Sequence, residues 1–299
     1  MRAPIRRLLA AMLWLFALAT TAAPNEEHAR KAAADAEAAA KKGPADIALA
    51  GQATLHLPAG HQFVPQPQAN ALLNAMGNPG KDPRLQGLIF PDSDAGWFMT
   101  VRFETSGYVK DDDAREWNAD ELLKSYREGT ESSNAERVKM GAPAIEIIGW
   151  AEKPAYDATT HRLVWAMSSR DKGASADAPQ GVNYNTYALG REGYFSLNLV
   201  TAVKELPQHK PAAHTLLAAL DYDAGKRYTD FDAKTDHVAE YGLAALVVGV
   251  AAKKLGLFAL GLAFFAKFAK VIVLGLAVIG GVAVKLFGKR KAATPTLPQ

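Results

Sequence analysis

The chain of 299 residues contains no cysteine. This absence excludes a structural disulfide bond, a zinc site with cysteine ligands and a lipid attached to an N-terminal cysteine. Acidic residues are also missing from residues 1–23 and from residues 241–299, and the second of these stretches holds eight Lys and Arg. Between them, residues 24–240 hold 31 acidic and 23 basic residues. The sequence therefore predicts an acidic body flanked by segments suited to a membrane.

Motifs of several protein classes are absent as well. The sequence has no G-x-S-x-G nucleophile elbow, no G-x-x-x-x-G-K-[ST] phosphate loop, no G-x-G-x-x-G after a strand and no H-E-x-x-H zinc motif. Basic residues of the body form no stripe with interleaved aromatics, so nucleic-acid binding is not expected. No cofactor and no metal are expected, and a binding protein is favoured over an enzyme.

The first 23 residues have the layout of a secretory signal peptide. Three arginines precede an apolar run over residues 8–19, and small residues follow. An apolar core of this length is short for a membrane-spanning helix. We therefore expect export and cleavage near Ala22 or Ala23, with an uncleaved N-terminal anchor as the alternative.

The rest of the chain up to residue 240 predicts an α+β fold. Residues 24–44, rich in alanine and charge, are expected to form a solvated helix or spacer before a folded body at residues 45–240. The stretch GWFMTVRFET alternates apolar and polar residues, which predicts a half-buried strand. Further strands are expected in hairpin pairs, at 144–150 with 161–169 and at 182–190 with 194–202. Helices are expected at 119–139 and from about Pro211. This order favours an antiparallel sheet with helices on one face.

Three consecutive carboxylates, Asp111 to Asp113, stand between an expected strand and an expected helix. A calcium loop of the EF-hand type needs glycine at its sixth position and glutamate at its twelfth, where this chain has Glu116 and Leu122. Asn118 is a natural N-cap for the helix that follows. We interpret the triplet as the charged entrance to that helix. A loose cation site or an acid–base site at Asp111 and Asp113 is the alternative.

A second candidate stretch, residues 149–166, carries aromatic residues on either side of an acidic loop. Trp150 could line a ligand groove, and Asp157 could act as an acid or base. Tryptophan on neighbouring strands is more often hydrophobic core. Core packing is therefore our interpretation of Trp97, Trp150 and Trp165.

The basic C-terminal part predicts a membrane anchor. Residues 271–284 are apolar and lie between two lysines, and a basic flank follows them. We expect one spanning helix at about 268–287 within an anchoring tail at 241–291, and a disordered cytoplasmic end at 292–299. The protein would then be a single-pass protein of the bacterial inner membrane, with its main domain outside the cytoplasm.

Before the expected spanning helix, small residues recur at heptad spacing. They are Gly242, Ala245, Gly249, Ala252, Gly256 and Ala259, followed by Ala263 and Ala266. Such a face lets helix backbones approach closely in a membrane. We expect this seam to pack against a second copy of the chain, a membrane-protein partner or residues 271–287. Chance alignment in a Gly/Ala-rich segment is the alternative.

Several short stretches give the chain a resemblance to a known family. They are GYVKDDDA, NADELL, GWAEKPAYD, HRLVWA, LGREGYFSLNLV, GKRYTDF and AEYGLAALVVGVAAKKLGL. In this order, over about residues 45–290, they resemble the uncharacterised membrane-anchored bacterial proteins of domain-of-unknown-function family 2167. The resemblance implies an envelope protein with an extracytoplasmic domain and a C-terminal anchor, and no catalytic residues can be carried over.

The favoured function is therefore a membrane-anchored envelope protein whose extracytoplasmic domain binds or senses a partner. The alternatives are an envelope enzyme that uses Asp/Glu acid–base chemistry and a metal-binding envelope protein.

Overall fold

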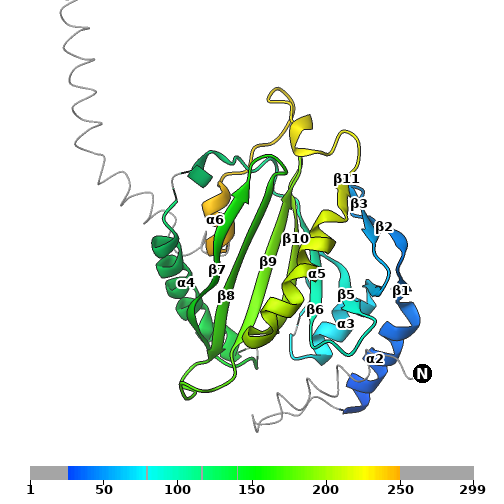
Figure 1. The fold of residues 1–299 in the computed structure, drawn as a ribbon, viewed down its shortest axis with the longest axis vertical. Coiled ribbons are helices and arrows are strands. Elements are labelled where there is room, and N and C mark those ends of the chain that lie inside the picture. The colour runs from blue at the N-terminus through cyan, green and yellow to red at the C-terminus, as the bar shows by residue number, and fades with distance from the viewer. Residues whose placement is uncertain (1–25, 79, 116, 140, 250–299) are drawn as a thin grey trace, which may run out of the picture. The chain divides into compact units, whose positions relative to one another are not determined.

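The computed structural model describes residues 26–78, 80–115, 117–139 and 141–249 (Figure 1). The expected signal peptide and the expected spanning helix at 268–287 lie outside these residues. In the ranges described, no helix is long and apolar enough to cross a membrane.

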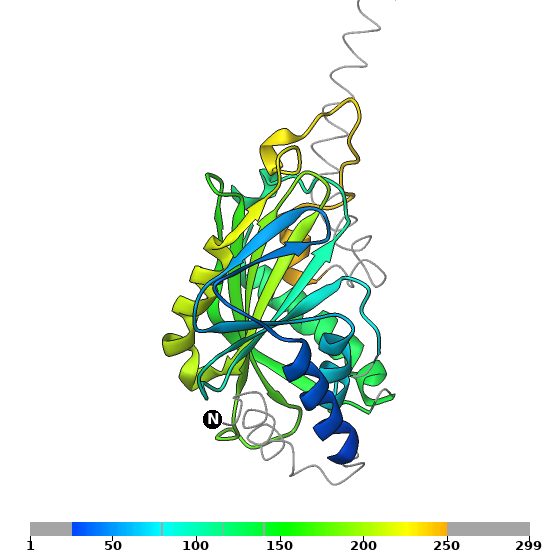
Figure 2. The same ribbon diagram turned by 90° about the vertical axis from the view of Figure 1, so that its right-hand side faces the viewer.

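An antiparallel sheet of eight strands forms the centre of the fold, in the order β1-β4-β5-β6-β10-β9-β8-β7. Its strands are β1 (Lys41–Lys42), β4 (His61–Pro65), β5 (Leu85–Pro91), β6 (Phe98–Glu104), β7 (Ile145–Asp157), β8 (Arg162–Asp171), β9 (Gly181–Leu189) and β10 (Tyr194–Ala202). A second antiparallel sheet contains β2 (Ala45–Leu49), β3 (Ala53–Leu57) and β11 (Leu220–Tyr222). Figure 2 shows this small sheet, in blue and yellow, over one face of the main sheet. The α+β class and the predicted hairpins β7–β8 and β9–β10 are confirmed.

Five helices are described: α2 (Glu26–Ala39), α3 (Gln68–Ala75), α4 (Ala119–Lys139), α5 (Leu206–Ala218) and α6 (Leu243–Val248). Three short 3-10 helices accompany them: η1 (Asp112–Arg115), η2 (Val203–Glu205) and η3 (Tyr228–Asp230). The helix predicted at 119–139 has the predicted bounds. The prediction of a start near Pro211 is wrong, because α5 begins at Leu206 and holds Pro211 inside. Its first turn contains Pro207, and proline is favoured there because the missing N–H would have no partner.

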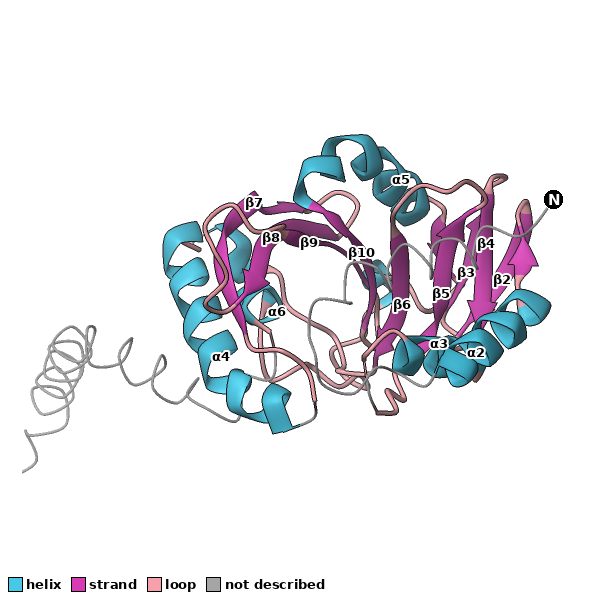
Figure 3. Cartoon of the chain, turned by 90° about the horizontal axis from the view of Figure 1, so that it is seen from below, coloured by secondary structure: helices cyan, strands magenta, loops and turns pink. Residues whose placement is uncertain are grey.

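Helices cover both faces of the main sheet, so the prediction of helices on one face is wrong (Figure 3). On one face Met99 belongs to a core that includes α5 and the small sheet. On the other face Phe98 belongs to a core that includes α2 and α3. Neighbouring residues of a strand point to opposite faces, and here both are apolar and buried. A sheet that is apolar on both faces has to be covered on both.

Helix α2 is part of this fold, which differs from the expected solvated spacer. Ala29, Ala33 and Ala36 are 3%, 4% and 0% exposed. Their spacing places them on one side of the helix, and Ala33 and Ala36 pack in the core with Leu72 and Leu73 of α3. The small alanine side chains let α2 lie close to α3. The folded body therefore includes residues well before position 45.

Side chains of α4 close the long edge strand β7. The amide of Asn134 donates to the carbonyl of Ile145 and accepts from its N–H, both at 2.9 Å. The guanidinium of Arg127 donates to the carbonyls of Ile147, at 3.1 Å, and of Ile148. These contacts satisfy backbone groups that an edge strand otherwise leaves free to pair with another chain.

Candidate functional site

Side chains from distant parts of the chain meet beside the β7–β8 hairpin. The hydroxyl of Tyr156 donates to Oδ2 of Asp111 at 2.7 Å and lies 3.1 Å from Nδ1 of His161. Tyr156 has one hydroxyl proton, so we assign the second hydrogen bond to an Nδ1–H of His161 that donates to the tyrosine oxygen. In a neutral ring, Nε2 then carries no proton and can accept a hydrogen bond. The result is a hydrogen-bonded chain from a carboxylate through a tyrosine to an imidazole.

The turn of the hairpin fixes His161 in an unusual conformation. Its φ angle is 53°, in the left-handed region that residues other than glycine rarely adopt. Asp157 closes the turn by accepting from the hydroxyl of Thr160 and from the N–H of Thr159, both at 2.8 Å. These bonds, that from Thr160 foremost, lower the pKa of Asp157. Asp157 is thus an ionised turn residue, whereas the strained His161 is the residue that the turn presents to the cluster.

Aromatic rings pack against the His161 side of the cluster. The ring of His161 lies 4.2 Å from that of Tyr228. Tyr108 stacks on Tyr228 at 4.3 Å and on Phe231 at 3.9 Å. Burial raises the pKa of Tyr228 and, together with the hydrogen bond to Asp111, that of Tyr156. Both phenols therefore remain neutral at ordinary pH and act as hydrogen-bonding groups rather than nucleophiles.

Asp113 has a different set of partners. Its carboxylate accepts the backbone N–H groups of Leu243 and Ala244, each at 3.0 Å, at the start of α6. The N-cap of this helix is Gly242, whose lack of a side chain leaves the space that Asp113 fills. Asn118 caps α4, as predicted, through the N–H of Asp120 at 2.9 Å. The interpretation of the triplet as the entrance to α4 is thus replaced: Asp113 caps α6, and Asp111 is bonded to Tyr156.

The segment that leads into α6 is also joined to the loop before the triplet. The N–H of Tyr108 donates to the carbonyl of His237, and the N–H of Ala239 donates to the carbonyl of Tyr108, both at 2.8 Å. Gly107 allows this approach, since a Cβ there would lie 2.6 Å from the carbonyl oxygen of His237. Residues 107–113 are therefore bound to α6 and to the strand-like segment before it.

Helix α6 belongs to the folded body, although the sequence placed it in the anchoring tail. Leu243 and Val247 are fully buried, and Ala245 is 7% exposed. The helix ends at Gly249, where φ is 84°. A heptad seam requires one helix that continues through Gly242, Ala245 and Gly249, but α6 ends at Gly249. The seam residues Ala252, Gly256 and Ala259 lie outside the described residues.

The tryptophans pack as structural residues. Nε1 of Trp150 donates to the carbonyl of Ala119 at 3.0 Å, which fixes the start of α4 against β7. Trp97 and Trp165 are 3% and 2% exposed. None of the three is placed like an exposed ring of a ligand groove.

A carboxylate and an imidazole do approach each other, since Asp111 Oδ2 lies 3.9 Å from Nδ1 of His161. In the part of the chain that the structure describes, no group of three or more His, Asp or Glu is placed to hold a metal ion. The two side chains are 28% and 22% exposed, so a small polar group or a proton can reach them.

Sequence reasoning singled out Asp111 and the aromatic stretch 149–166 that contains Tyr156, but it missed the roles of His161 and Tyr228. Asp111, the Tyr156–His161 pair and Tyr228 are far apart in sequence, and no spacing rule connects them. One signal could have found them: each lies in a stretch that carries the family resemblance, namely GYVKDDDA, GWAEKPAYD, HRLVWA or GKRYTDF. The structure brings these four stretches together.

Comparison with known proteins bears out the resemblance inferred from those stretches. The family model described as Protein of unknown function (DUF2167) matches residues 41–280. Among curated proteins none matches the chain. The solution structure of cyanobacterial PsbP (CyanoP) from Synechocystis sp. PCC 6803 is similar at a TM-score of 0.36 and 11% identity, over 62% of this chain and 94% of that one. A likeness at that level supports no conclusion about function.

Proposed function

We propose that this chain, which belongs to the DUF2167 family of proteins of unknown function, is a membrane-anchored protein of the bacterial envelope. Its folded body lies outside the cytoplasm and senses a partner at the Asp111–Tyr156–His161 cluster. The signal-peptide layout of residues 1–23 and the basic, acid-free residues 241–299 support export and anchoring.

The observation that carries the sensing proposal is the cap that Asp113 places on α6. Helix α6 is the last described element before the proposed anchor in the sequence. Asp111 is two residues from the cap and is bonded to Tyr156. A partner or a proton that moves Asp111 therefore acts on the loop that fixes α6. The segment from Asp111 to Asp113 thus connects the cluster to the helix cap, and the proposal requires that this segment has two arrangements, which a partner shifts.

An enzyme that uses Asp111, Asp113 and Asp157 is supported less well. The three carboxylates have separate structural partners: the hydroxyl of Tyr156, the first N–H groups of α6 and the Thr159–Thr160 turn. An acid–base pair needs two groups that converge on one substrate atom. Each of these three carboxylates instead stabilises a different local part of the fold.

Export and anchoring are tested together in bacteria that make the full-length protein with a C-terminal epitope. We expect the protein in the inner-membrane fraction after an alkaline wash. Protease added to spheroplasts should digest the body and leave the epitope protected. Mass spectrometry should place the mature N-terminus next to Ala22 or Ala23.

Recovery of the protein in the soluble fraction, or protection of the body in intact spheroplasts, would contradict this placement. Retention of residues 1–18 by the purified protein would contradict cleavage.

A further inference from the structure

Three different donor atoms converge at the cluster beside the β7–β8 hairpin. The hydroxyl oxygen of Tyr156 lies 2.7 Å from Oδ2 of Asp111 and 3.1 Å from Nδ1 of His161, and these last two atoms are 3.9 Å apart. Metal ions of the first transition row bind oxygen and nitrogen at about 2.0–2.2 Å, which places neighbouring ligand atoms about 3 Å apart. Two of the three separations match this spacing, and the third is wider. A carboxylate, a phenol and an imidazole are thus arranged like ligands on one side of a metal ion.

The tyrosine completes this donor set. Metal sites in proteins usually use three or four protein ligands, and Asp111 and His161 alone supply two. Asp113, the other carboxylate that the sequence suggested for a cation, is bonded to the start of α6 instead. The hydroxyl of Tyr156 is the third ligand. A phenol in the set therefore decides which ion fits.

The surroundings of the phenol favour a cation. Asp111 and Asp157 are the carboxylates that act on the hydroxyl of Tyr156. Asp111 forms an ion pair with His161, and among the residues that the structure describes it is paired with no Lys or Arg. A bound metal ion would supply the positive charge that this group of acids lacks.

A second set of the same three groups shows the difference that a lysine makes. Under α5, the hydroxyl of Tyr184 lies 3.2 Å from Oε1 of Glu152 and 3.0 Å from Nε2 of His214. Nζ of Lys210 lies 2.5 Å from Oε2 of Glu152 and 5.7 Å from the centre of the Tyr184 ring. The lysine already supplies the positive charge there. This second set therefore has no need of a metal ion and is the natural control for the first.

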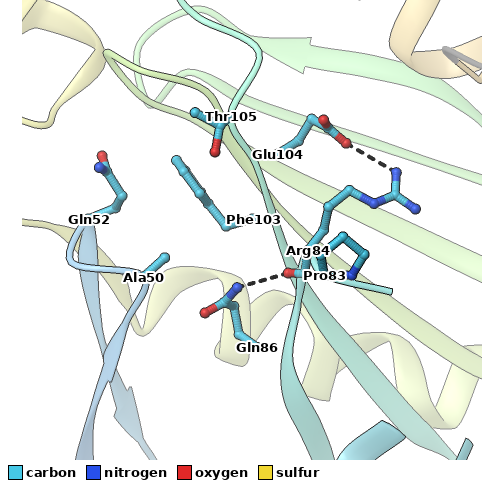
Figure 4. Close-up of a pocket in the computed structure, with 8 residues that line it drawn as sticks. All are labelled: Ala50, Gln52, Pro83, Arg84, Gln86, Phe103, Glu104 and Thr105. Atoms are coloured by element: carbon cyan, nitrogen blue, oxygen red, sulfur yellow. Dashed lines mark hydrogen bonds and ion pairs between the residues drawn. The ribbon is translucent and has the colours of Figure 1, made fainter. Parts of the chain in front are cut away.

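A cavity of about 390 Å³ at the end of the two sheets provides no free carboxylate for a cation (Figure 4). It is lined by the turn between β2 and β3, the segment before β5 and the end of β6. Glu104 in its wall is paired with Arg84 at 3.1 Å. Arg84 and Arg102 are also each 2.8 Å from Asp82. The charges in and beside this wall are already neutralised by one another.

We propose that the Asp111–Tyr156–His161 cluster binds a ferric ion. The proposal rests on the proposed function, because it names the ligand of the site to which that function assigns sensing. On binding, Tyr156 releases its hydroxyl proton to solvent, and the proton of His161 moves from Nδ1 to Nε2. The carboxylate, the phenolate oxygen and Nδ1 then coordinate the ion, and water or a small chelating anion fills the remaining positions.

The phenol selects a trivalent ion over a divalent one. Burial, and then the hydrogen bond to Asp111, raise the pKa of Tyr156. Such a phenol gives up its proton near neutral pH only to a strong Lewis acid, and a bound cation can reverse the effect of the surroundings in this way. Phenolate is also a hard, anionic oxygen donor, which suits Fe(III) better than Zn(II) or Mn(II).

The test titrates ferric nitrilotriacetate into the full-length protein in detergent and follows the visible absorption. We expect one iron per chain and the charge-transfer band of a phenolate bound to Fe(III), a signal that carboxylate and imidazole ligands alone do not give. Zinc and manganese(II) salts are added in parallel at equal concentration, and neither should displace the iron.

Tyr156→Phe keeps the ring and removes the phenolate, so the band should disappear and iron affinity should fall by about tenfold or more. Asp111→Asn keeps the shape of the side chain, removes its charge and should weaken iron binding by a similar factor. The matched control is Tyr184→Phe, which should keep the band and leave affinity within about twofold. Thermal unfolding without iron verifies that each variant is folded, and either cluster variant suffices if the other is not.

The proposal is overturned if iron gives no visible band, if the folded cluster variants bind iron like the wild type, or if zinc or manganese displaces the iron. Hydrogen exchange of the α6 amides, measured on the same samples, tests the sensing role separately. Slower exchange with iron supports both the site and its role. Iron binding with unchanged exchange supports the site and contradicts sensing through α6, and neither result depends on export or anchoring.

Discussion

The carboxylate of Asp113 accepts a hydrogen bond of 3.0 Å from the backbone N–H of Leu243, 130 residues further along the chain. A second bond of the same length comes from Ala244. The first N–H groups of a helix have no partner within the helix, and an acidic side chain near them is favoured by the helix dipole. One aspartate thus joins the loop before α4 to the last described helix.

Replacing Asp113 with alanine should destabilise the body by about 1 kcal/mol, which is typical for the loss of a helix cap. Hydrogen exchange of the α6 amides should rise at the same time, because the bonds to Leu243 and Ala244 are lost. The control is Asp112→Ala, in the same turn of η1. Equal effects of the two substitutions on α6 would refute the specific role of Asp113.

Gly242→Ala should act through the same carboxylate. A Cβ at this position would lie 2.5 Å from Oδ2 of Asp113, so the carboxylate has to move away from α6. In a double-mutant cycle, the cost of Gly242→Ala should therefore fall when Asp113 is already alanine. Denaturant unfolding of the four proteins measures this coupling. Additive costs would mean that the two residues act independently.

Asp82, which is paired with Arg84 and Arg102 at 2.8 Å each, should make the stability of the body depend on pH in the acid range. The pKa of Asp82 is lowered to about 2 in the folded protein, against the ordinary value of 3.8. A carboxyl with a lowered folded pKa contributes stability above its unfolded pKa, and this contribution is lost as the pH falls through the folded pKa. Asp82→Asn should thus be less stable than the wild type at pH 6, and the difference should shrink between about pH 4 and pH 2. Urea unfolding across this range measures it, and a difference that stays constant with pH would count against the ion pairs.

The small-residue seam beyond Gly249 gives a matched comparison of neighbouring positions. Ala252 lies on the seam and Ala251 does not. A leucine on a close-packed face pushes two backbones apart, and lipid surroundings provide no compensating hydrophobic gain. Ala252→Leu should reduce crosslinking of the full-length protein in detergent, while Ala251→Leu should not. Gly249 is unsuitable for this test because its φ of 84° would strain any larger residue. Identical crosslinking of both variants would mean that the seam reflects composition alone.

Local patterns predicted the five strands β6 to β10 and the longest helix. Alternation identified β6, hairpin spacing identified β9 and β10, and Asn118 marked the start of α4. What local patterns could not predict depends on contacts between distant segments. The alanines of α2 look the same in sequence whether they face solvent or α3, and only the tertiary packing decides between the two.

The candidate site was also predicted only in part, because its contacts join distant segments of the chain. The aspartate triplet suggested the charged entrance to α4, the helix that follows it in the sequence. The helix that Asp113 caps, however, begins at Leu243, and nothing in the sequence near position 113 identifies it. His161 and Tyr228 lie near Asp111 only because the β7–β8 turn and η3 meet the loop before α4. The sequence assigned α6 to the anchoring tail because its residues are as apolar as those of a membrane segment.

The most direct test of the account is whether the Asp111–Tyr156–His161 cluster controls α6. Hydrogen exchange is measured on full-length protein carrying Tyr156→Phe, which removes the hydroxyl bonded to Asp111 and His161. The control is Tyr184→Phe, which removes a hydroxyl bonded to Glu152 and His214 on the face under α5. The account predicts that the amides of residues 243–248 exchange about fivefold faster in Tyr156→Phe, because the loss of one hydrogen bond costs about 1 kcal/mol. In Tyr184→Phe these amides should exchange as in the wild type. Unchanged exchange of α6 in Tyr156→Phe would contradict it.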